Sequence, residues 1–402
     1  MTKCQNCNAK CVPILDLGRQ VICNRFLKSK KALDKERRYP LSIVFCPKCS
    51  LVQQAILLPT SLIFNKNFNY LSGASKDAVS HFEYMAKRLS KEFKLKKTDF
   101  VMDIGSCDGV FLKPLKEKEI GVIGVEPTPK PAKIANAQGI HTIVKQFEQV
   151  PKTVRLPKIK LVTAFNVIAH TSTIHPFLEG VEMILSKTPN SVFLSQSQYL
   201  PDILEKDSFD TLYHEHNRFY TIKSLQNLFA RHNLHIYDAQ RIGYYGGSII
   251  VYASIEKRPQ TKRLKAIINA ERKYTKLSTY KQFGNEVKAK RDKLRKLLAS
   301  AKNQGKRIVG IGAPMKSSVL LSYCGITPKI IDVLTEVNAL KIGTYSPSGI
   351  KVVDEKKYFK HNAPDMAMIL SWNMSDTIMK SLRKSGYKGK FLIPLPDPKI
   401  VA

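Results

Sequence analysis

The alternation of apolar, strand-like runs with helix-like segments constrains the fold of this chain more than any other feature. The centre of the sequence carries the runs FVMDIG, VIGVEP, LVTAFNVIAH and SVFLSQS, and a second series follows with KRIVGIGAP, IIDVLTE, MAMILSW and GKFLIPLP. Strands that alternate with helices form parallel sheets covered by helices. The pattern therefore predicts an α/β protein with two doubly wound, Rossmann-like domains.

The length of 402 residues exceeds what one hydrophobic core usually serves. A range rich in Cys and turn residues precedes the first strand series, and a range rich in Lys, Arg, Ala and Leu separates the two series. We expect a small N-terminal module at 1–73, an α/β domain at 74–256, a helical linker at 257–304 and a second α/β domain at 305–402.

The formal net charge of +34 suits an anionic partner, which can be nucleic acid, an acidic membrane surface or a phosphorylated small molecule. The lysines are spread along the chain, however, as is typical of a solvated surface. No apolar run approaches the ~20 residues of a membrane helix, and the start MTKCQNCNAKC lacks the apolar segment of a secretory signal. We expect a cytoplasmic protein without a membrane partner.

Two CxxC pairs, Cys4 with Cys7 and Cys46 with Cys49, lie in the N-terminal range. In a chain without a secretory signal, paired CxxC motifs favour a structural zinc ion over disulfides, because each motif presents two sulfurs to one tetrahedral ion. The long segment between the pairs must hold structure of its own. Redox-active or unrelated thiols are the alternative interpretation.

The run FVMDIG enters the turn Gly105-Ser-Cys-Asp-Gly109, and the next strand ends in Glu126, which can accept hydrogen bonds from both hydroxyls of a ribose. NAD and S-adenosylmethionine both fit this arrangement. The turn lacks the full GxGxxG that seats a pyrophosphate, which favours S-adenosylmethionine; an ordinary strand-to-helix turn is the remaining alternative. The candidate cofactor residues are Gly105, Cys107, Asp108, Gly109, Glu126 and Asn166.

The segment Tyr213-His214-Glu215-His216 places two imidazoles, a carboxylate and a phenol in consecutive positions. Histidine is the usual proton carrier near neutral pH, and a neighbouring carboxylate can orient it. The order differs from HExxH, whose spacing faces two imidazoles toward one zinc ion, so we favour proton transfer over metal binding. A polar surface loop is the alternative.

Two further candidates lie outside that segment. His170 ends the strand LVTAFNVIAH, where it would face the same crevice as Glu126, although a core histidine fits the position equally well. Tyr70, in FNYLSGAS, precedes the cofactor domain and could fold over its mouth.

Together these segments resemble the sugar C-methyltransferases of the deoxysugar pathways over almost the full length. The segments that carry the resemblance are the CxxC pair with CPKCSLVQ, NYLSGAS, DIGSCDGVFLKPL with GVEPT, FDTLYHEHNRFYTIKSL, GGSIIVYAS, GIGAPMKSSVLLSYCGI, ILSWNM and GKFLIPLPDPKIV. The chain departs from the family with Cys107 in place of an asparagine and with IDVLTEVNALKIG, which lacks an Asp-Arg and an Asn-Pro pair.

The resemblance implies methylation of the carbon beside the keto group of a nucleotide-linked sugar, with S-adenosylmethionine as the methyl donor. It implies that His216 removes the α proton with support from Glu215. It further implies that Tyr213 and His170 lie near the sugar, that Tyr70 closes over it, and that the C-terminal domain is nucleotide-binding-like. A monomer is compatible with this interpretation.

Three rival functions remain on the sequence alone, and one of them is an unrelated sugar-modifying activity on the same scaffold. A methyltransferase acting on nucleic acid would explain a zinc module and a basic chain, but the sequence lacks an N/D-P-P-[YFW] motif and a concentrated basic arm. A scaffold without catalytic activity would keep the fold and the cofactor, and the intact Tyr-His-Glu-His segment argues against it.

Overall fold

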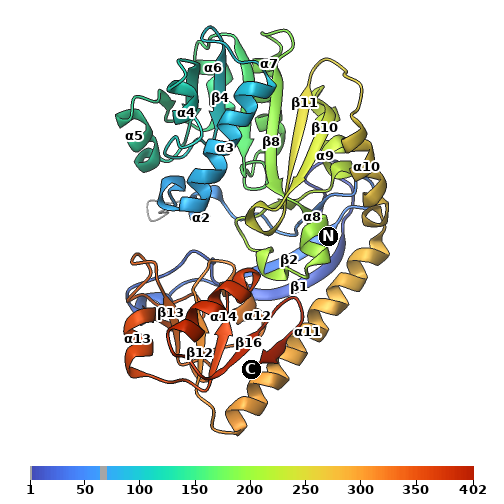
Figure 1. Cartoon of the computed structure of the whole chain (residues 1–402). Coiled ribbons are helices and arrows are strands. Elements are labelled where there is room, and N and C mark those ends of the chain that lie inside the picture. The colour runs from blue at the N-terminus through green and yellow to red at the C-terminus, as the bar shows by residue number, and fades with distance from the viewer. Residues whose placement is uncertain (1, 64–69) are drawn as a thin grey trace.

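The computed structural model describes residues 2–63 and 70–402, so that Phe68 and Asn69 of the predicted Tyr70 segment lie outside the described residues. Figure 1 shows the central sheet at the top and the C-terminal sheet at the bottom, with strands of the N-terminal module between them. The prediction of two Rossmann-like α/β units preceded by a cysteine module is confirmed.

The N-terminal sheet is antiparallel and has the strand order β1-β2-β3-β9. Its elements are β1 (Val12–Gln20), α1 (Lys30–Asp34), β2 (Tyr39–Phe45), β3 (Val52–Gln54), α2 (Thr60–Ile63) and β9 (Arg218–Phe219). The last strand belongs to the range that the sequence assigns to the central domain, so the N-terminal sheet draws on both ranges. The predicted boundaries at residues 73, 256 and 304 stay a proposal.

The central sheet has the order β10-β11-β8-β7-β4-β5-β6. Its strands are β4 (Phe100–Ile104), β5 (Gly121–Val125), β6 (Thr142–Ile143), β7 (Ile159–Phe165), β8 (Val192–Gln198), β10 (His235–Ile242) and β11 (Ser248–Ser254). The strands from β4 to β8 pair in parallel as predicted, but β11 runs antiparallel to both of its neighbours. The short connection between β10 and β11 allows only antiparallel pairing, because parallel neighbours need a long crossover.

Helices cover this sheet, and their apolar spacing explains their positions. They are α3 (Lys76–Glu92), α4 (Lys113–Lys116), α5 (Pro129–Ala137), α6 (Val150–Thr153), α7 (Ile174–Leu185) and α9 (Ile222–Phe229), whereas the buried side chains of α8 (Leu200–Glu205) join the core of β1 and the C-terminal domain. In α3 the Ser75 side chain caps the N-terminus by accepting from Ala78 N, and Phe82, Met85 and Leu89 are buried at helical spacing.

The C-terminal sheet has the order β14-β13-β12-β15-β16-β17 and is parallel except for its last strand. Its elements are β12 (Ile308–Ile311), α12 (Ser317–Tyr323), β13 (Val333–Glu336), β14 (Lys351–Asp354), α13 (Glu355–His361), β15 (Met366–Ile369), α14 (Ser375–Lys384), β16 (Lys390–Ile393) and β17 (Lys399–Val401). In both parallel sheets the chain reverses its strand order beside the first strand, β4 or β12. Open α/β sheets bind ligands at the carboxyl ends of the strands at such a point.

The predicted helical linker forms α10 (Lys262–Ala270) and α11 (Leu277–Asn303), and α11 runs along one side of the molecule in Figure 1. With 27 residues, α11 is about 40 Å long. Its buried side chains join the core of the C-terminal domain and of β1, and Gly284 approaches β1 so closely that a Cβ would lie 2.3 Å from Ile14 O. No helix among the described residues is long and apolar enough to cross a membrane.

Candidate active site

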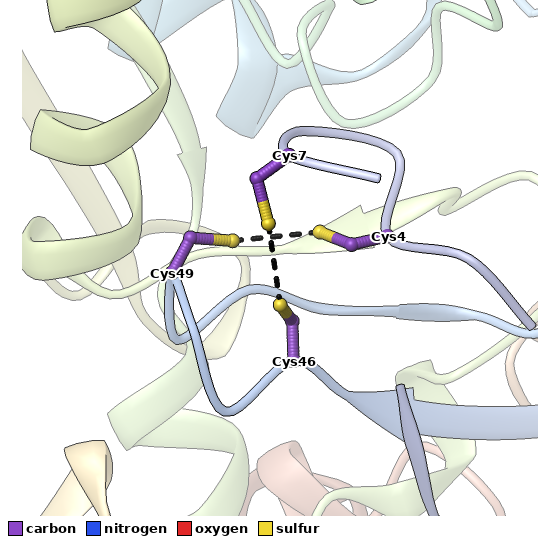
Figure 2. A group of neighbouring side chains, drawn as sticks. All are labelled: Cys4, Cys7, Cys46 and Cys49. Carbon is purple, nitrogen blue, oxygen red and sulfur yellow. Dashed lines mark hydrogen bonds between the residues drawn. The ribbon is translucent and has the colours of Figure 1, made fainter. Parts of the chain in front are cut away.

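Four cysteine thiols come together in the N-terminal module. The Sγ atoms of Cys4, Cys7, Cys46 and Cys49 lie within 4.8 Å of one another. The Cys4–Cys49 distance is 3.4 Å and the Cys7–Cys46 distance is 3.5 Å (Figure 2). Sulfurs around a tetrahedral zinc lie about 3.8 Å apart, because each Zn–S bond is about 2.3 Å long, whereas a disulfide joins sulfurs at about 2.05 Å. The predicted ligand set therefore fits zinc.

Both CxxC pairs lie on turns of the same shape. Asn8 N donates to Cys4 O over 3.0 Å, and Ser50 N donates to Cys46 O over 2.9 Å. Asn8 and Ser50 both have left-handed backbone, with φ of 59° and 61°. These matching turns direct the thiols of each pair toward a common point. Four thiolates close the coordination shell, so this ion stabilises the fold and leaves no position for an activated water.

The glycine turn after β4 requires its glycines. Gly105 and Gly109 have left-handed φ of 70° and 82°, and a Cβ on Gly105 would lie 2.5 Å from the side chain of Val167. Because glycine has no side chain, the turn leaves a crevice open at the carboxyl end of β4, which is where doubly wound sheets bind nucleosides.

Glu126 directly follows β5, and its carboxylate bonds to the glycine turn after β4 and to the turn after β5. Its Oε2 accepts from Cys107 N over 3.1 Å and its Oε1 accepts from Thr128 N over 2.7 Å. Burial raises the pKa of Glu126, and the two backbone donors act in the opposite direction. Each carboxylate oxygen keeps a free lone pair, so the group can still accept from both hydroxyls of a ribose. In the C-terminal domain Glu336 has the same place at the end of β13 and accepts from Ala313 N over 2.9 Å.

The other predicted cofactor residues fall into two groups. Asn166 and Cys107 line the crevice and both have left-handed backbone, with φ of 58° and 51°. Asp108 instead accepts from Gly73 N over 2.9 Å, and Gly109 packs against Ile140. The structure therefore brings Gly105, Cys107, Glu126 and Asn166 to the cavity, whereas Asp108 and Gly109 shape the turn behind it.

His216 is held in the state of a neutral base. Its Nδ1 lies 2.8 Å from Thr211 O, and a carbonyl oxygen can only accept, so Nδ1 carries the proton and Nε2 keeps its lone pair. The side chain is buried, and burial together with nearby His170 lowers its pKa well below 6.5. Near neutral pH the imidazole is therefore uncharged and able to take up a proton at Nε2.

Two aromatic groups flank this imidazole. The Tyr213 ring centroid lies 4.1 Å and the His170 ring centroid 4.8 Å from that of His216. Burial raises the pKa of Tyr213, so its phenol stays protonated, and burial lowers the pKa of His170 to about 4, so its ring stays neutral. Both side chains line the same cavity as His216. The phenol of Tyr213 can donate a hydrogen bond to a developing oxyanion, whereas the neutral ring of His170 already shares its N–H with the backbone of Glu215.

The remaining members of the Tyr-His-Glu-His segment have other partners, although Glu215 also lines the cavity. The Glu215 carboxylate accepts from Cys23 Sγ over 3.5 Å, and burial raises its pKa to about 7. Its predicted support of His216 stays a prediction, since the orienting contact of that ring is the carbonyl of Thr211. His214 turns away from the cavity and lies 3.3 Å from Pro40 O in the N-terminal module.

A single large cavity of about 1230 Å³ joins these parts. It begins at the glycine turn and Glu126, passes Tyr213 and His216, and ends at the residues after β12 and β15 in the C-terminal domain. A molecule of nucleotide-sugar size can therefore reach the base while part of it lies against the C-terminal domain.

Tyr70 forms a hydrogen bond with Tyr245, a residue that the sequence analysis did not single out. Its hydroxyl lies 2.8 Å from that of Tyr245 in the loop between β10 and β11, and both rings line the cavity. Tyr245 has φ of 51°. Gly247 lies two residues further on, where a Cβ would lie 2.2 Å from the side chain of Asp202. The two consecutive glycines after Tyr245 are the only local signal for this tight loop.

Lys316 is the second cavity residue that sequence reasoning missed. It follows the glycine turn after β12, and its Nζ lies 3.7 Å from Asp210 Oδ2 and 4.2 Å from the ring centroid of Trp372. Trp372 Nε1 donates to the same Asp210 oxygen over 2.8 Å. Asp210 is fully buried, so this ion pair links the central and C-terminal domains and sets a cation at the cavity.

Comparisons with known proteins agree with this geometry. Family models match three consecutive parts of the chain: a zinc binding domain at 4–64, a methyltransferase domain at 79–239 and a C-methyltransferase C-terminal domain at 243–396. A curated relative, C-methyltransferase NovU of Streptomyces niveus, is 26% identical over 97% of this chain and 94% of its own length. Together these matches support a C-methyltransferase with an N-terminal zinc module.

Solved structures match parts of this chain at low identity and low TM-score. Magnesium protoporphyrin IX methyltransferase of Synechocystis PCC 6803 is 12% identical, with a TM-score of 0.33 over 44% of this chain and 78% of its own. The 1,6-didemethyltoxoflavin N1-methyltransferase of Burkholderia thailandensis is 13% identical, with a TM-score of 0.34 over 43% of this chain and 76% of its own.

This C-methyltransferase depends on S-adenosylmethionine and carries a structural zinc, as predicted. The four clustered thiols are a group that can hold this metal. The crevice with Gly105, Glu126 and Asn166 is where the residues fit the methyl donor, because it combines an open backbone turn with an acid for the ribose.

Replacing Glu126 by alanine is expected to weaken S-adenosylmethionine binding by about 1 to 3 kcal/mol, because buried donors lose a charged acceptor. Titration calorimetry on the purified protein measures the effect. Glu336→Ala is the matched control: it removes the corresponding acid of the C-terminal domain and should leave the affinity for the methyl donor unchanged. Equal affinities in Glu126→Ala and wild type, or tight NAD binding by the wild type, would refute the assignment.

Proposed function

We propose that this C-methyltransferase acts on the carbon beside the keto group of a nucleotide-linked sugar, with His216 as the base. One observation carries the proposal. A neutral imidazole with its Nε2 free for a proton lies in a cavity that joins the methyl-donor crevice to a cation in a second Rossmann-like domain. The nucleotide-binding-like role of the C-terminal domain is part of the same proposal.

The chemistry needs an acidic C–H bond, and a neighbouring carbonyl provides it. His216 Nε2 takes the α proton, and the electrons of the C–H bond move into an enolate on the substrate. Tyr213 donates a hydrogen bond to the enolate oxygen, where the charge develops, and His170 lies beside the sugar. S-adenosylmethionine, when bound, supplies an electrophilic methyl group. Gly105, Glu126 and Asn166 would hold this donor; the enolate carbon would receive the methyl group, and the electrons of the broken S–CH₃ bond would stay on sulfur.

Other residues bind and cover the substrate in this proposal. Lys316 offers its charge to the diphosphate that links sugar and nucleoside, while Asp210 and Trp372 hold the ammonium group in place. Tyr70 and Tyr245 close the mouth over the reacting carbon and exclude water. Zinc takes no part in the chemical steps, because its thiolate shell is closed.

The test is methyl transfer from labelled S-adenosylmethionine to a panel of acceptors. Nucleoside-diphosphate 4-keto deoxysugars should gain one methyl group on carbon, detected by mass spectrometry and located by NMR. The basic chain makes nucleic acid the rival acceptor, so total RNA and duplex DNA belong in the same panel. Label in nucleic acid and none in any keto sugar would overturn the proposal.

A further inference from the structure

Gln54 joins the zinc module to the catalytic segment. This residue ends β3, shortly after the zinc ligand Cys49, and is 1% exposed. Its Nε2 donates to Tyr213 O over 2.9 Å and to His216 O over 2.8 Å, so both amide hydrogens are used. Its backbone N–H donates to Asn217 O over 3.0 Å. One residue of the zinc module thus holds three carbonyls of the segment that carries the base.

The zinc site in turn holds Gln54. Gln5, which lies between the ligands Cys4 and Cys7, donates from Nε2 to Gln54 O over 3.3 Å. The strand β3 also pairs with β9, which begins directly after the catalytic segment. The backbone carbonyl of Gln54 thus contacts one zinc-binding turn, and its side-chain amide contacts the backbone around the base.

This backbone decides where the imidazole of His216 lies. His216 N donates to Tyr213 O over 2.9 Å and closes a turn, and the ring then reaches Thr211 O. Without the Gln54 amide, two buried carbonyls lose a donor and the turn is free to shift. A shift of about 1 Å at a reacting group can cost 10²-fold in rate.

We infer that Gln54 is a positioning residue for His216, through which the zinc module fixes the geometry of proton abstraction. The inference rests on the proposed role of His216 as the base. It assigns the N-terminal module a part in turnover, in addition to its contribution to the stability of the fold.

The expected effect of Gln54→Met is a fall of kcat by about 10- to 100-fold, with KM and S-adenosylmethionine affinity close to wild type. Methionine keeps the length of the side chain and removes both donors. Gln20→Met is the matched control, because Gln20 is also a buried glutamine of the N-terminal module and its side-chain amide donates to Leu17 O, away from the catalytic segment. The control should keep the wild-type kcat.

A double-mutant cycle separates positioning from general damage. If Gln54 acts through His216, Gln54→Met should cause no further loss in a His216→Ala background. An equal loss in both backgrounds, or a wild-type kcat in Gln54→Met, would overturn the inference. His216→Ala with wild-type turnover would instead overturn the proposed function, and the single variant alone reveals this outcome.

Zinc content and thermal unfolding must first show that the variants fold. If Gln54→Met does not, Gln54→Glu enters the same cycle. Glutamate matches the shape of the amide but sets an acceptor oxygen against the two carbonyls, so it loses at least one donor. The same two outcomes then decide the inference.

Discussion

Replacement of His216 by alanine is expected to lower turnover by about 10² to 10⁴, the usual contribution of a positioned acid or base. The reason is that Nε2 of this buried, neutral ring is the proposed acceptor of the α proton, with Nδ1 engaged by Thr211 O. S-adenosylmethionine affinity should change little, because His216 lies outside the crevice around Glu126. Steady-state kinetics and calorimetry measure the two quantities separately.

Deuterium exchange isolates the proton transfer itself. In deuterated water and without the methyl donor, the wild type should exchange the α hydrogen of the keto sugar, provided that the site assembles without the cofactor, and His216→Ala should not. Glu215→Gln is the comparison variant and should do less harm, because this carboxylate bonds to Cys23 rather than to the base. If His216→Ala turned over normally, the role of base would pass to His170.

Loss of the zinc site is the second large effect. A structural zinc contributes about 10 to 16 kcal/mol of apparent binding free energy in small modules at neutral pH, and this free energy supports folding. Wild type should contain about one zinc per chain, whereas Cys46→Ser combined with Cys49→Ser should contain almost none. The double variant should also unfold at a much lower temperature and lose activity, since β3 and Gln54 follow these ligands directly.

Elemental analysis and thermal unfolding measure these effects. Cys11→Ser is the control, because Cys11 is a buried free cysteine near the cluster but outside the ligand set. It should retain the metal. Equal zinc in the double variant and the wild type would contradict the assignment of the four thiols.

The sequence predicted those parts of the fold that have a local signal. Apolar runs marked β4, β5, β7 and β8, and paired CxxC motifs marked the zinc ligands, because strand burial and ligand spacing are properties of short segments. The strand β9 has two residues and exists only because β3 lies beside it. The antiparallel direction of β11 depends in the same way on a contact that apolar runs do not encode.

In the candidate site, too, the sequence predicted residues by their type but not the contacts that depend on folding. Residue types singled out His216, Tyr213 and Glu126, all of which reach the cavity. The orienting partner of His216 is a backbone carbonyl, which leaves no trace in residue types, so the sequence favoured the adjacent Glu215 instead. Lys316 and Tyr245 come from distant segments, and only the folded chain brings them to the cavity that also holds the base.

The shared sheet β1-β2-β3-β9 limits how this chain can be recombined with its relatives. In a chimera with the N-terminal module of a relative, β9 would pair with a β3 strand of different sequence. The side chain at the position of Gln54, which binds the catalytic turn, could then differ as well. An active chimera therefore requires that residues 209–220 and residues 2–63 come from the same parent protein. The N-terminal sheet is therefore a structural unit made of two segments that are not adjacent in the sequence. A shortened chain that begins at residue 74 would lack β3 and leave β9 without its partner strand.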